Sequence, residues 1–224
     1  MLLLFFGSGC LLAQDIGRHP AIDSIAVRYL QRAGNQSPLF SGKAQENYPQ
    51  MLNHPYFVDW KFVKAPLSYC GVFYPEAMLR LDLNRDELVV ISPDFHQIVL
   101  SPENVDFVKL YDQYIIYFHR NNLPGCPPSG YYFQIHSGEY MVLEKQTYTM
   151  DRSEPLYILY TFFYLYKDGV YYSIRSKRGL LKILHPYKKE LKKFISTHPL
   201  YFRKDEKRYF IRDVVRYYEM LSDR

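Results

Sequence analysis

An acidic turn at residues 82–87, Asp-Leu-Asn-Arg-Asp-Glu, is the stretch of the sequence with the spacing closest to a metal-binding loop. Its first residues follow the D-x-N-x-D pattern with which calcium loops place oxygen ligands around the ion. Glu87 stands where such a loop needs a glycine for its sharp bend, and Pro93 stands where a bidentate glutamate belongs. The spacing therefore predicts a polar hairpin turn rather than a calcium site.

The histidines could supply metal ligands or a general base, but the seven of them are scattered and their spacing fits no metal site. The sequence holds no H-E-x-x-H, C-x-x-C, G-x-S-x-G or phosphate-binding glycine loop. A Ser/His/Asp triad assembled from distant residues stays open, because its members need not be close in sequence. We predict no catalytic residue, no metal and no cofactor on this basis.

The first residues, MLLLFFGSGCLLA, combine a short apolar run with a final small residue. This pattern predicts a signal peptide over residues 1–13 and an exported protein, in the periplasm or associated with the outer membrane. The positive segment typical of a signal is missing, since no Lys or Arg precedes Arg18. The alternative is a lipoprotein acylated on Cys10, although Gly7 stands where a leucine is preferred.

Cys70 and Cys126 remain in the predicted mature chain. An even number of cysteines in an exported protein favours pairing. A bond between them would close a loop of about 55 residues and add about 4 kcal/mol in the chain-entropy model. We predict this disulfide, with two buried free thiols as the alternative.

Positive charge is concentrated at the C-terminal end. Residues 1–170 hold 13 Lys and Arg against 17 Asp and Glu, a balance of −4, whereas residues 171–224 hold 15 against 6, a balance of +9. The candidate contacts for an acidic partner are Arg175, Lys177, Arg178, Lys204, Arg208, Arg212 and Arg216, of which the last four recur every fourth residue as one ridge on a helix. They form either a solvated helix face or a surface for an acidic protein or anionic lipid headgroups, and nucleic acid is not expected for an exported protein.

The central element of the chain is a hairpin within residues 157–184. Two aromatic runs flank Asp168-Gly169, a dipeptide that accepts the positive φ angles of a two-residue turn. The turn predicts that Lys167 pairs with Val170 and Leu165 with Tyr172. One face, with Phe163, Leu165, Tyr172 and Ile174, is expected in a core, and the other, with Phe162, Tyr164, Tyr166 and Tyr171, is expected to be half exposed.

The remaining segments predict an α+β fold, a mainly antiparallel β-sheet domain with an N-terminal helix and a C-terminal pair of helices. Residues 14–224 form one mixed domain: a helix and ordered loop over 14–66, a β-rich body over 67–184, and a basic helical pair over 185–224. A second hairpin is predicted across Ser137-Gly138, with Ile135 opposite Tyr140 and Phe133 opposite Val142.

Several short motifs are spread along the predicted mature chain. They are Leu39-Phe40-Ser41-Gly42, His54-Pro55-Tyr56-Phe57, Gly71-Val72-Phe73-Tyr74, Leu81-Asp82-Leu83, Asp86-Glu87-Leu88-Val89-Val90, Tyr172, Ser176-Lys177-Arg178 with Leu180-Leu181, and Lys188-Lys189-Glu190-Leu191-Lys192-Lys193-Phe194-Ile195. Together they resemble an uncharacterised exported family of Bacteroidetes. That family has no assigned activity. The resemblance therefore implies export and a shared fold, and it transfers no functional residue.

Taken together, these features predict a non-enzymatic envelope protein that binds or scaffolds a partner. The alternative is a hydrolase that acts on envelope glycan or peptide through residues distant in sequence. A buried His–carboxylate pair inside a deep pocket would favour the hydrolase. A pocket without such a pair, beside a basic surface, would favour the binding protein.

Overall fold

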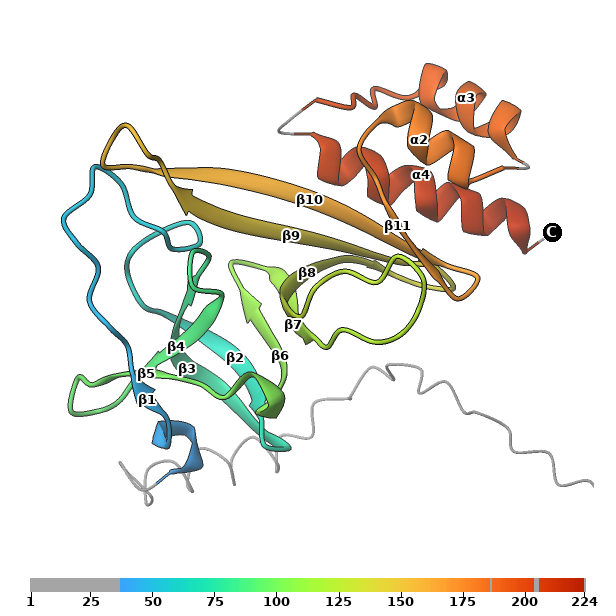
Figure 1. Ribbon diagram of the computed structural model, residues 1–224. Coiled ribbons are helices and arrows are strands. Elements are labelled where there is room, and N and C mark those ends of the chain that lie inside the picture. Colours follow the sequence, from blue (N-terminus) through green and yellow to red (C-terminus); the bar gives the residue numbers. More distant parts are fainter. Residues whose placement is uncertain (1–36, 186, 204–205, 224) are drawn as a thin grey trace, which may run out of the picture.

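One antiparallel sheet runs through the protein, and helices pack against one end of it (Figure 1). The computed structural model describes residues 37–185, 187–203 and 206–223, which contain 11 strands and the helices α2, α3 and α4. The predicted α+β class, with a mainly antiparallel sheet and a C-terminal helical pair, is confirmed. The predicted N-terminal helix and the predicted signal peptide lie outside the described residues.

Most strands pair with the strand next to them in the chain. The strands are β1 (Lys43–Ala44), β2 (Val63–Tyr69), β3 (Val72–Asp82), β4 (Glu87–Ile91), β5 (Gln97–Val99), β6 (Val105–Leu110), β7 (Gln113–Phe118), β8 (Gly130–Ser137), β9 (Met141–Met150), β10 (Tyr157–Lys167) and β11 (Val170–Ser173). The helices are α2 (Lys177–Ile183), α3 (Lys188–Thr197) and α4 (Lys207–Ser222), with 3-10 turns at η2 (Pro38–Phe40) and η3 (Pro102–Asn104). The order across the sheet is β1-β5-β4-β3-β2-β6-β7-β8-β9-β10-β11.

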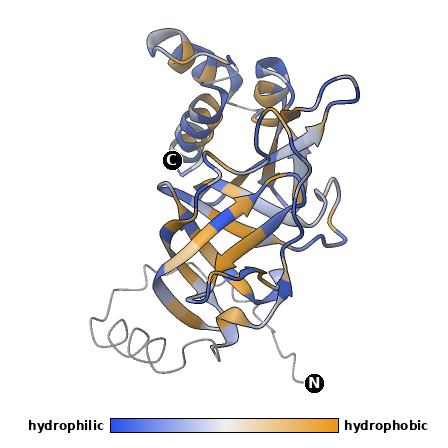
Figure 2. Cartoon of the chain, turned by 90° about the vertical axis from the view of Figure 1, so that its left-hand side faces the viewer, coloured by the Kyte–Doolittle hydropathy of each residue, from blue (hydrophilic) through white to orange (hydrophobic). Residues whose placement is uncertain are grey.

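A first hydrophobic core is formed mainly by strands β2 to β8. Leu67, Leu79, Val108, Ile115 and Phe133 belong to it, and each is at most 1% exposed. Alternate residues are buried along β2, as the period of two of a strand requires, and the strands in this part of the sheet carry many hydrophobic residues (Figure 2). We call this cluster the first core.

The loop between β1 and β2 packs on the sheet, in line with the prediction from its many apolar residues. Arg80 of β3 holds it in place, since its guanidinium donates to the backbone oxygen of Trp60 at 2.7 Å. The same guanidinium lies 3.9 Å from the ring centroid of Tyr56 and 4.2 Å from that of Phe62. Arg80 is 7% exposed, and burial lowers its pKa.

The Asp168-Gly169 turn between β10 and β11 has the predicted geometry. The φ angles of these residues are 51° and 76°, and Lys167 pairs with Val170 as expected. A Cβ atom added to Gly169 would meet nothing within 4 Å. The left-handed backbone, rather than lack of space, is therefore what calls for glycine at this position.

A second core joins the helices to one face of β9, β10 and β11. Leu165 and Ile174 from the hairpin pack there with Leu191 of α3 and with Phe210 and Ile211 of α4. Each of α3 and α4 therefore buries one apolar face, and we call α2, α3 and α4 the helical cap. No described helix is long and apolar enough to cross a membrane.

The short helix α2 was not predicted, because its residues were assigned to the β-rich body over 67–184. The Ser176 hydroxyl accepts a hydrogen bond from the Gly179 N–H at 3.0 Å and caps the helix start. Leu180 and Leu181 are buried in the second core. Three helices therefore follow the hairpin within the described residues, instead of the expected pair alone.

The opposite face of the sheet carries a smaller cluster of Phe118, Tyr132, Leu143 and Tyr171. Tyr171 was expected to be half exposed, yet it is 7% exposed, because the loop before β8 covers it. The backbone N–H of Tyr171 donates to the backbone oxygen of Pro124 at 2.9 Å. A Cβ atom added to Gly125 would lie 2.0 Å from the backbone oxygen of Tyr171. Glycine is required at this close approach of two backbones.

The predicted register of the β8–β9 hairpin is wrong. Phe133 pairs with Glu144 rather than with Val142, and Val142 pairs with His136. A β-bulge between Gln134 and His136 adds a residue to β8. The sequence alone did not reveal it, since a bulge shifts the pairing without changing the alternation of apolar residues nearby.

Candidate functional site

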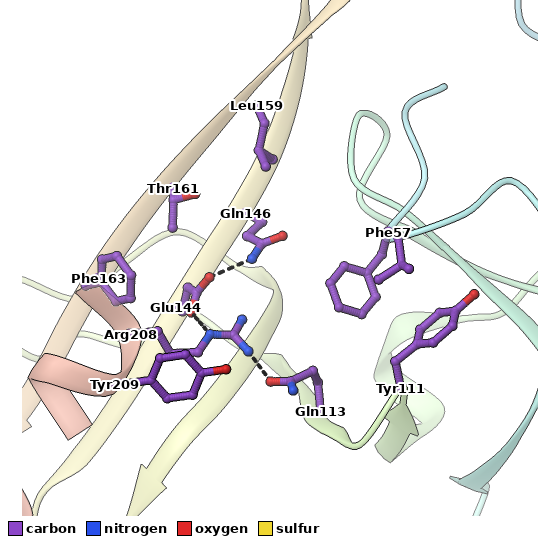
Figure 3. Close-up of a pocket in the computed structure, with 11 residues that line it drawn as sticks. Phe57, Tyr111, Gln113, Glu144, Gln146, Leu159, Thr161, Phe163, Arg208 and Tyr209 are labelled. Atoms are coloured by element: carbon purple, nitrogen blue, oxygen red, sulfur yellow. Dashed lines mark hydrogen bonds and ion pairs between the residues drawn. The ribbon is translucent and has the colours of Figure 1, made fainter. Parts of the chain in front are cut away.

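A groove of about 340 Å³ lies between the helical cap and the first core (Figure 3). Four parts of the chain line it: the loop before β2, the β6–β7 turn, the middle of β9 and β10, and the start of α4. The lining residues are Phe57, Val58, Tyr111, Gln113, Glu144, Gln146, Leu159, Thr161, Phe163, Arg208 and Tyr209.

The floor of the groove is the middle of the long β9–β10 hairpin. Side chains of β9 on this face are Val142 in the second core, Glu144 and Gln146 in the groove, and Tyr148 against the first core. On β10, Thr161 pairs with Gln146. Because alternate residues of a strand share a face, polar residues here occupy the interval between two apolar clusters. This interval keeps the two cores apart and gives the groove a polar floor.

Four polar side chains form a hydrogen-bonded chain across the groove (Figure 3). Gln146 Nε2 donates to Glu144 Oε1 at 2.6 Å, and Arg208 Nε donates to Glu144 Oε2. Arg208 Nη1 donates in turn to Gln113 Oε1. The side chain of Glu144 is 3% exposed and that of Arg208 is 18% exposed. This ion pair is therefore held largely out of water, where loss of either partner is costly.

These four hydrogen-bonded side chains leave some of their polar groups available to a ligand. Arg208 Nη2 and Gln113 Nε2 donate to no described residue, and Gln146 Oε1 accepts from none. These atoms are donors and an acceptor on neighbouring side chains of one groove. An amide group carries the complementary pair, a carbonyl oxygen and an N–H.

Aromatic side chains form the walls. Phe57 and Tyr111 face the polar chain from the side of the first core, with ring centroids 5.9 Å apart. Tyr111 is 42% exposed, and Tyr209 on the side of the cap is 51% exposed. Burial, with the Asp59 charge, raises the pKa of Tyr111, so its hydroxyl is a neutral donor at physiological pH. Rings with a polar tip suit contact with a partly apolar ligand.

The predicted basic ridge on α4 is not continuous. Arg208 points into the groove, because it lies three and seven residues before the buried Ile211 and Val215 and shares their side of the helix. A step of four residues turns about 40° further round a helix, so Arg212 and Arg216 lie progressively nearer solvent. Arg212 Nε donates to Asp213 at 2.8 Å, and Arg216 is exposed.

The other candidate basic residues precede α4 in the chain. Lys204 lies outside the described residues. Lys177 and Arg178 are exposed in the first turn of α2, with Lys177 Nζ 5.8 Å from the ring centroid of Phe210. Arg175 is exposed. Burial raises the pKa of Tyr164, and the positive charge of Arg175 partly offsets this rise. Of the described candidate basic residues, Arg208 alone lines the groove.

The cysteines are both free in the structure, so the predicted Cys70–Cys126 disulfide is not formed there. Cys70 is exposed in the β2–β3 turn with φ 52°. Cys126 is half-buried in the loop before β8, where its sulfur accepts from the Asn121 N–H at 3.3 Å. The two cysteines therefore lie in different connecting segments, one in the β2–β3 turn and one in the loop before β8.

A His–carboxylate pair is present, but it does not line the groove. His136 Nε2 lies 2.7 Å from Glu219 Oε2, and Glu219 Oε1 accepts from the Tyr140 N–H at 2.8 Å. This arrangement ties α4 to the β8–β9 turn. The acidic turn after β3 is likewise structural, since Asp82 Oδ1 accepts the N–H groups of Asn84 and Arg85.

No protein-family model matches the sequence, and neither curated proteins nor solved structures give a significant match to it. Sequence reasoning missed the groove, although it carried one signal. Glu144, Gln146 and Thr161 are polar residues at inward-facing positions in the middle of long strands. Polar residues at such positions are typical of a site rather than of a core.

Proposed function

We propose that the protein is a non-enzymatic binding module of the cell envelope, and that its ligand lies in the groove between the helical cap and the first core. The observation that carries this proposal is the polar chain from Gln146 to Gln113, which offers unused donors and an acceptor between exposed aromatic rings. Such a mixture of aromatic walls and a few fixed polar groups is typical of binding sites.

The arrangement favours binding over hydrolysis. Glu144 is the acidic residue among the described residues that line the groove, and its carboxylate is already bonded to Arg208 and Gln146. Glycoside hydrolysis usually needs a second carboxyl group about 5–10 Å away. Acyl transfer needs a nucleophile beside a base, and the His136–Glu219 pair lies elsewhere. The hydrolase alternative has less support for these reasons.

Photo-crosslinking in cells tests the proposal. Benzoylphenylalanine replaces Tyr209 or Tyr111, whose exposed rings form opposite walls of the groove. Met220, 57% exposed further along α4, is the matched control position. We expect the two groove positions to crosslink the same molecule and Met220 to crosslink none of it. Absence of a shared crosslinked product, or equal crosslinking from Met220, would contradict the proposal.

Export is a separate part of the proposal, and it rests on the apolar segment 1–13. We expect mass spectrometry of protein from native cells to find an N-terminus close to Gln14. An intact Met1 on cytosolic protein would contradict export and leave the groove unaffected.

A further inference from the structure

One edge of β10 is open beside the groove. The N–H and C=O of Tyr157 bond to the side chain of Asn53, at 2.7 and 2.8 Å, on the side away from β9. The Phe163 oxygen accepts from the Ile174 N–H at 2.8 Å on that same side. In an antiparallel ladder alternate residues face the same neighbour, so Leu159 and Thr161 also point their backbone groups outward. Within the described part of the chain, nothing pairs with them.

This open edge is short and closed at both ends. Asn53 occupies the position beside Tyr157, and β11 pairs with β10 from Tyr164 onward. Since the Phe163 oxygen already accepts from Ile174, the open part is the five residues 158–162, which span about 17 Å at 3.4 Å a residue. A second copy of β10, which has 11 residues, would collide with Asn53 and with β11. The edge therefore suits a short extended segment of another protein.

The open part of β10 lacks the residues that usually prevent an edge strand from pairing with another chain. Residues 157–163, YILYTFF, include no charged residue and no proline, the residues that commonly block pairing at an edge. Ile158, Tyr160 and Phe162 form a row on one face and are 37%, 46% and 46% exposed. Leu159, Thr161 and Phe163 line the groove on the other face.

We infer that an extended peptide segment of a partner protein adds to the Leu159–Thr161 edge of β10 as an extra strand. The inference rests on the proposed function, because it names the ligand class for the groove. Backbone groups of the segment pair with Leu159 and Thr161, and its side chains alternate between two faces. Those on one face are apolar and lie on the row of Ile158, Tyr160 and Phe162. Those on the other are small or polar and lie toward the groove.

The test uses a displayed library of random octapeptides selected on the full-length protein. Selected peptides are then measured on Thr161→Pro, which removes the outward N–H and leaves the hydrogen bonds to β9 in place. Thr161→Val is the matched control, since it keeps the N–H and removes the hydroxyl. We expect binding to weaken about tenfold more on Thr161→Pro than on Thr161→Val.

Amide hydrogen exchange on the unaltered protein gives a second readout that does not depend on how the proline variant folds. The Leu159 and Thr161 amides should exchange quickly in the free protein and become protected when a selected peptide binds. Failure to select any peptide, or bound peptides that leave these amides unprotected, would overturn the inference.

A third variant, Tyr209→Ala, separates the inference from the proposed function. Peptides weakened by Thr161→Pro and unaffected by Tyr209→Ala would support the edge and contradict the groove. Peptides weakened by Tyr209→Ala alone would support the groove and overturn strand addition at the edge.

Discussion

Arg208 of α4 and Glu144 of β9 form an ion pair at the point where the helical cap meets the middle of the long hairpin. The pair links the cap to the floor of the groove and fixes the guanidinium for contact with a ligand. Arg208 also lies over Phe133 of the first core, with 5.1 Å between its Cζ and the ring centroid. One side chain thus contacts both sides of the groove.

Arg208→Met should destabilise the protein by about 3 kcal/mol or more, because it leaves the carboxylate of Glu144 buried without its partner. Urea denaturation measures the change in the free energy of unfolding. Arg212→Met is the control, since Arg212 is 43% exposed and its partners are the neighbouring Asp213 and the exposed ring of Tyr209. A change within about 0.5 kcal/mol is expected.

The double variant Arg208→Met with Glu144→Leu should recover most of the loss, since it removes both charges and leaves apolar groups of similar size. An Arg208→Met variant as stable as Arg212→Met would show that the pair contributes little to the docking of the cap.

Gly169→Val should cost about 1–2 kcal/mol, because valine must adopt the positive φ of 76° in the β10–β11 turn. Thermal unfolding measures the loss. Gly169→Asn should cost less, since asparagine tolerates this backbone conformation and a Cβ here meets no neighbour. Equal melting temperatures for the valine variant and the native protein would exclude a left-handed residue at this position.

Stability should fall as the pH rises above 10. Burial raises the pKa of Tyr48, Tyr131 and Tyr132 above the ordinary value of 10.0. A raised pKa in the folded state means that the stabilisation is fully present below pH 10 and is lost as the pH rises toward the folded-state pKa. Lys145 and Lys207 act in the opposite direction, since burial lowers their pKa values although Asp86 and Glu144 partly offset this.

The tyrosines outweigh these two lysines, because burial raises the pKa of several more tyrosines, including Tyr56, Tyr114, Tyr148 and Tyr164. Urea midpoints between about pH 8 and about pH 11, with tyrosinate absorbance recorded in parallel, check the expectation. Full tyrosine ionisation in the folded protein near pH 10, without loss of stability, would contradict it.

Local patterns in the sequence were enough to predict the β-rich body, the turn at Asp168-Gly169 and the C-terminal pair of helices. Each depends on residues close together in the chain, such as a period of two or a dipeptide suited to positive φ. The shifted register of β8 and β9 was not predictable in this way, since the bulge after Gln134 leaves the apolar alternation intact.

The groove was beyond sequence reasoning for a different reason. Gln113 and Arg208 are 95 residues apart, and only the packing of α4 on the sheet brings them together. Arg208 was predicted to belong to a basic ridge. Because of the same packing, it is instead a largely buried partner of Glu144. The spacing of charged residues along a helix shows which of them lie on the same side of it, but the neighbouring elements determine which of them face solvent.

The most direct test of the groove as a binding site is side-chain NMR with N-acetyl dipeptide amides as probes at millimolar concentration. We predict that the Arg208 Nε–H signal and the side-chain amide signals of Gln113 and Gln146 shift together and saturate along one binding curve. The methyl signal of Met220, exposed on the same helix as Arg208, should stay in place. Unchanged groove signals at every probe concentration, or shifts confined to residues such as Met220, would contradict the account.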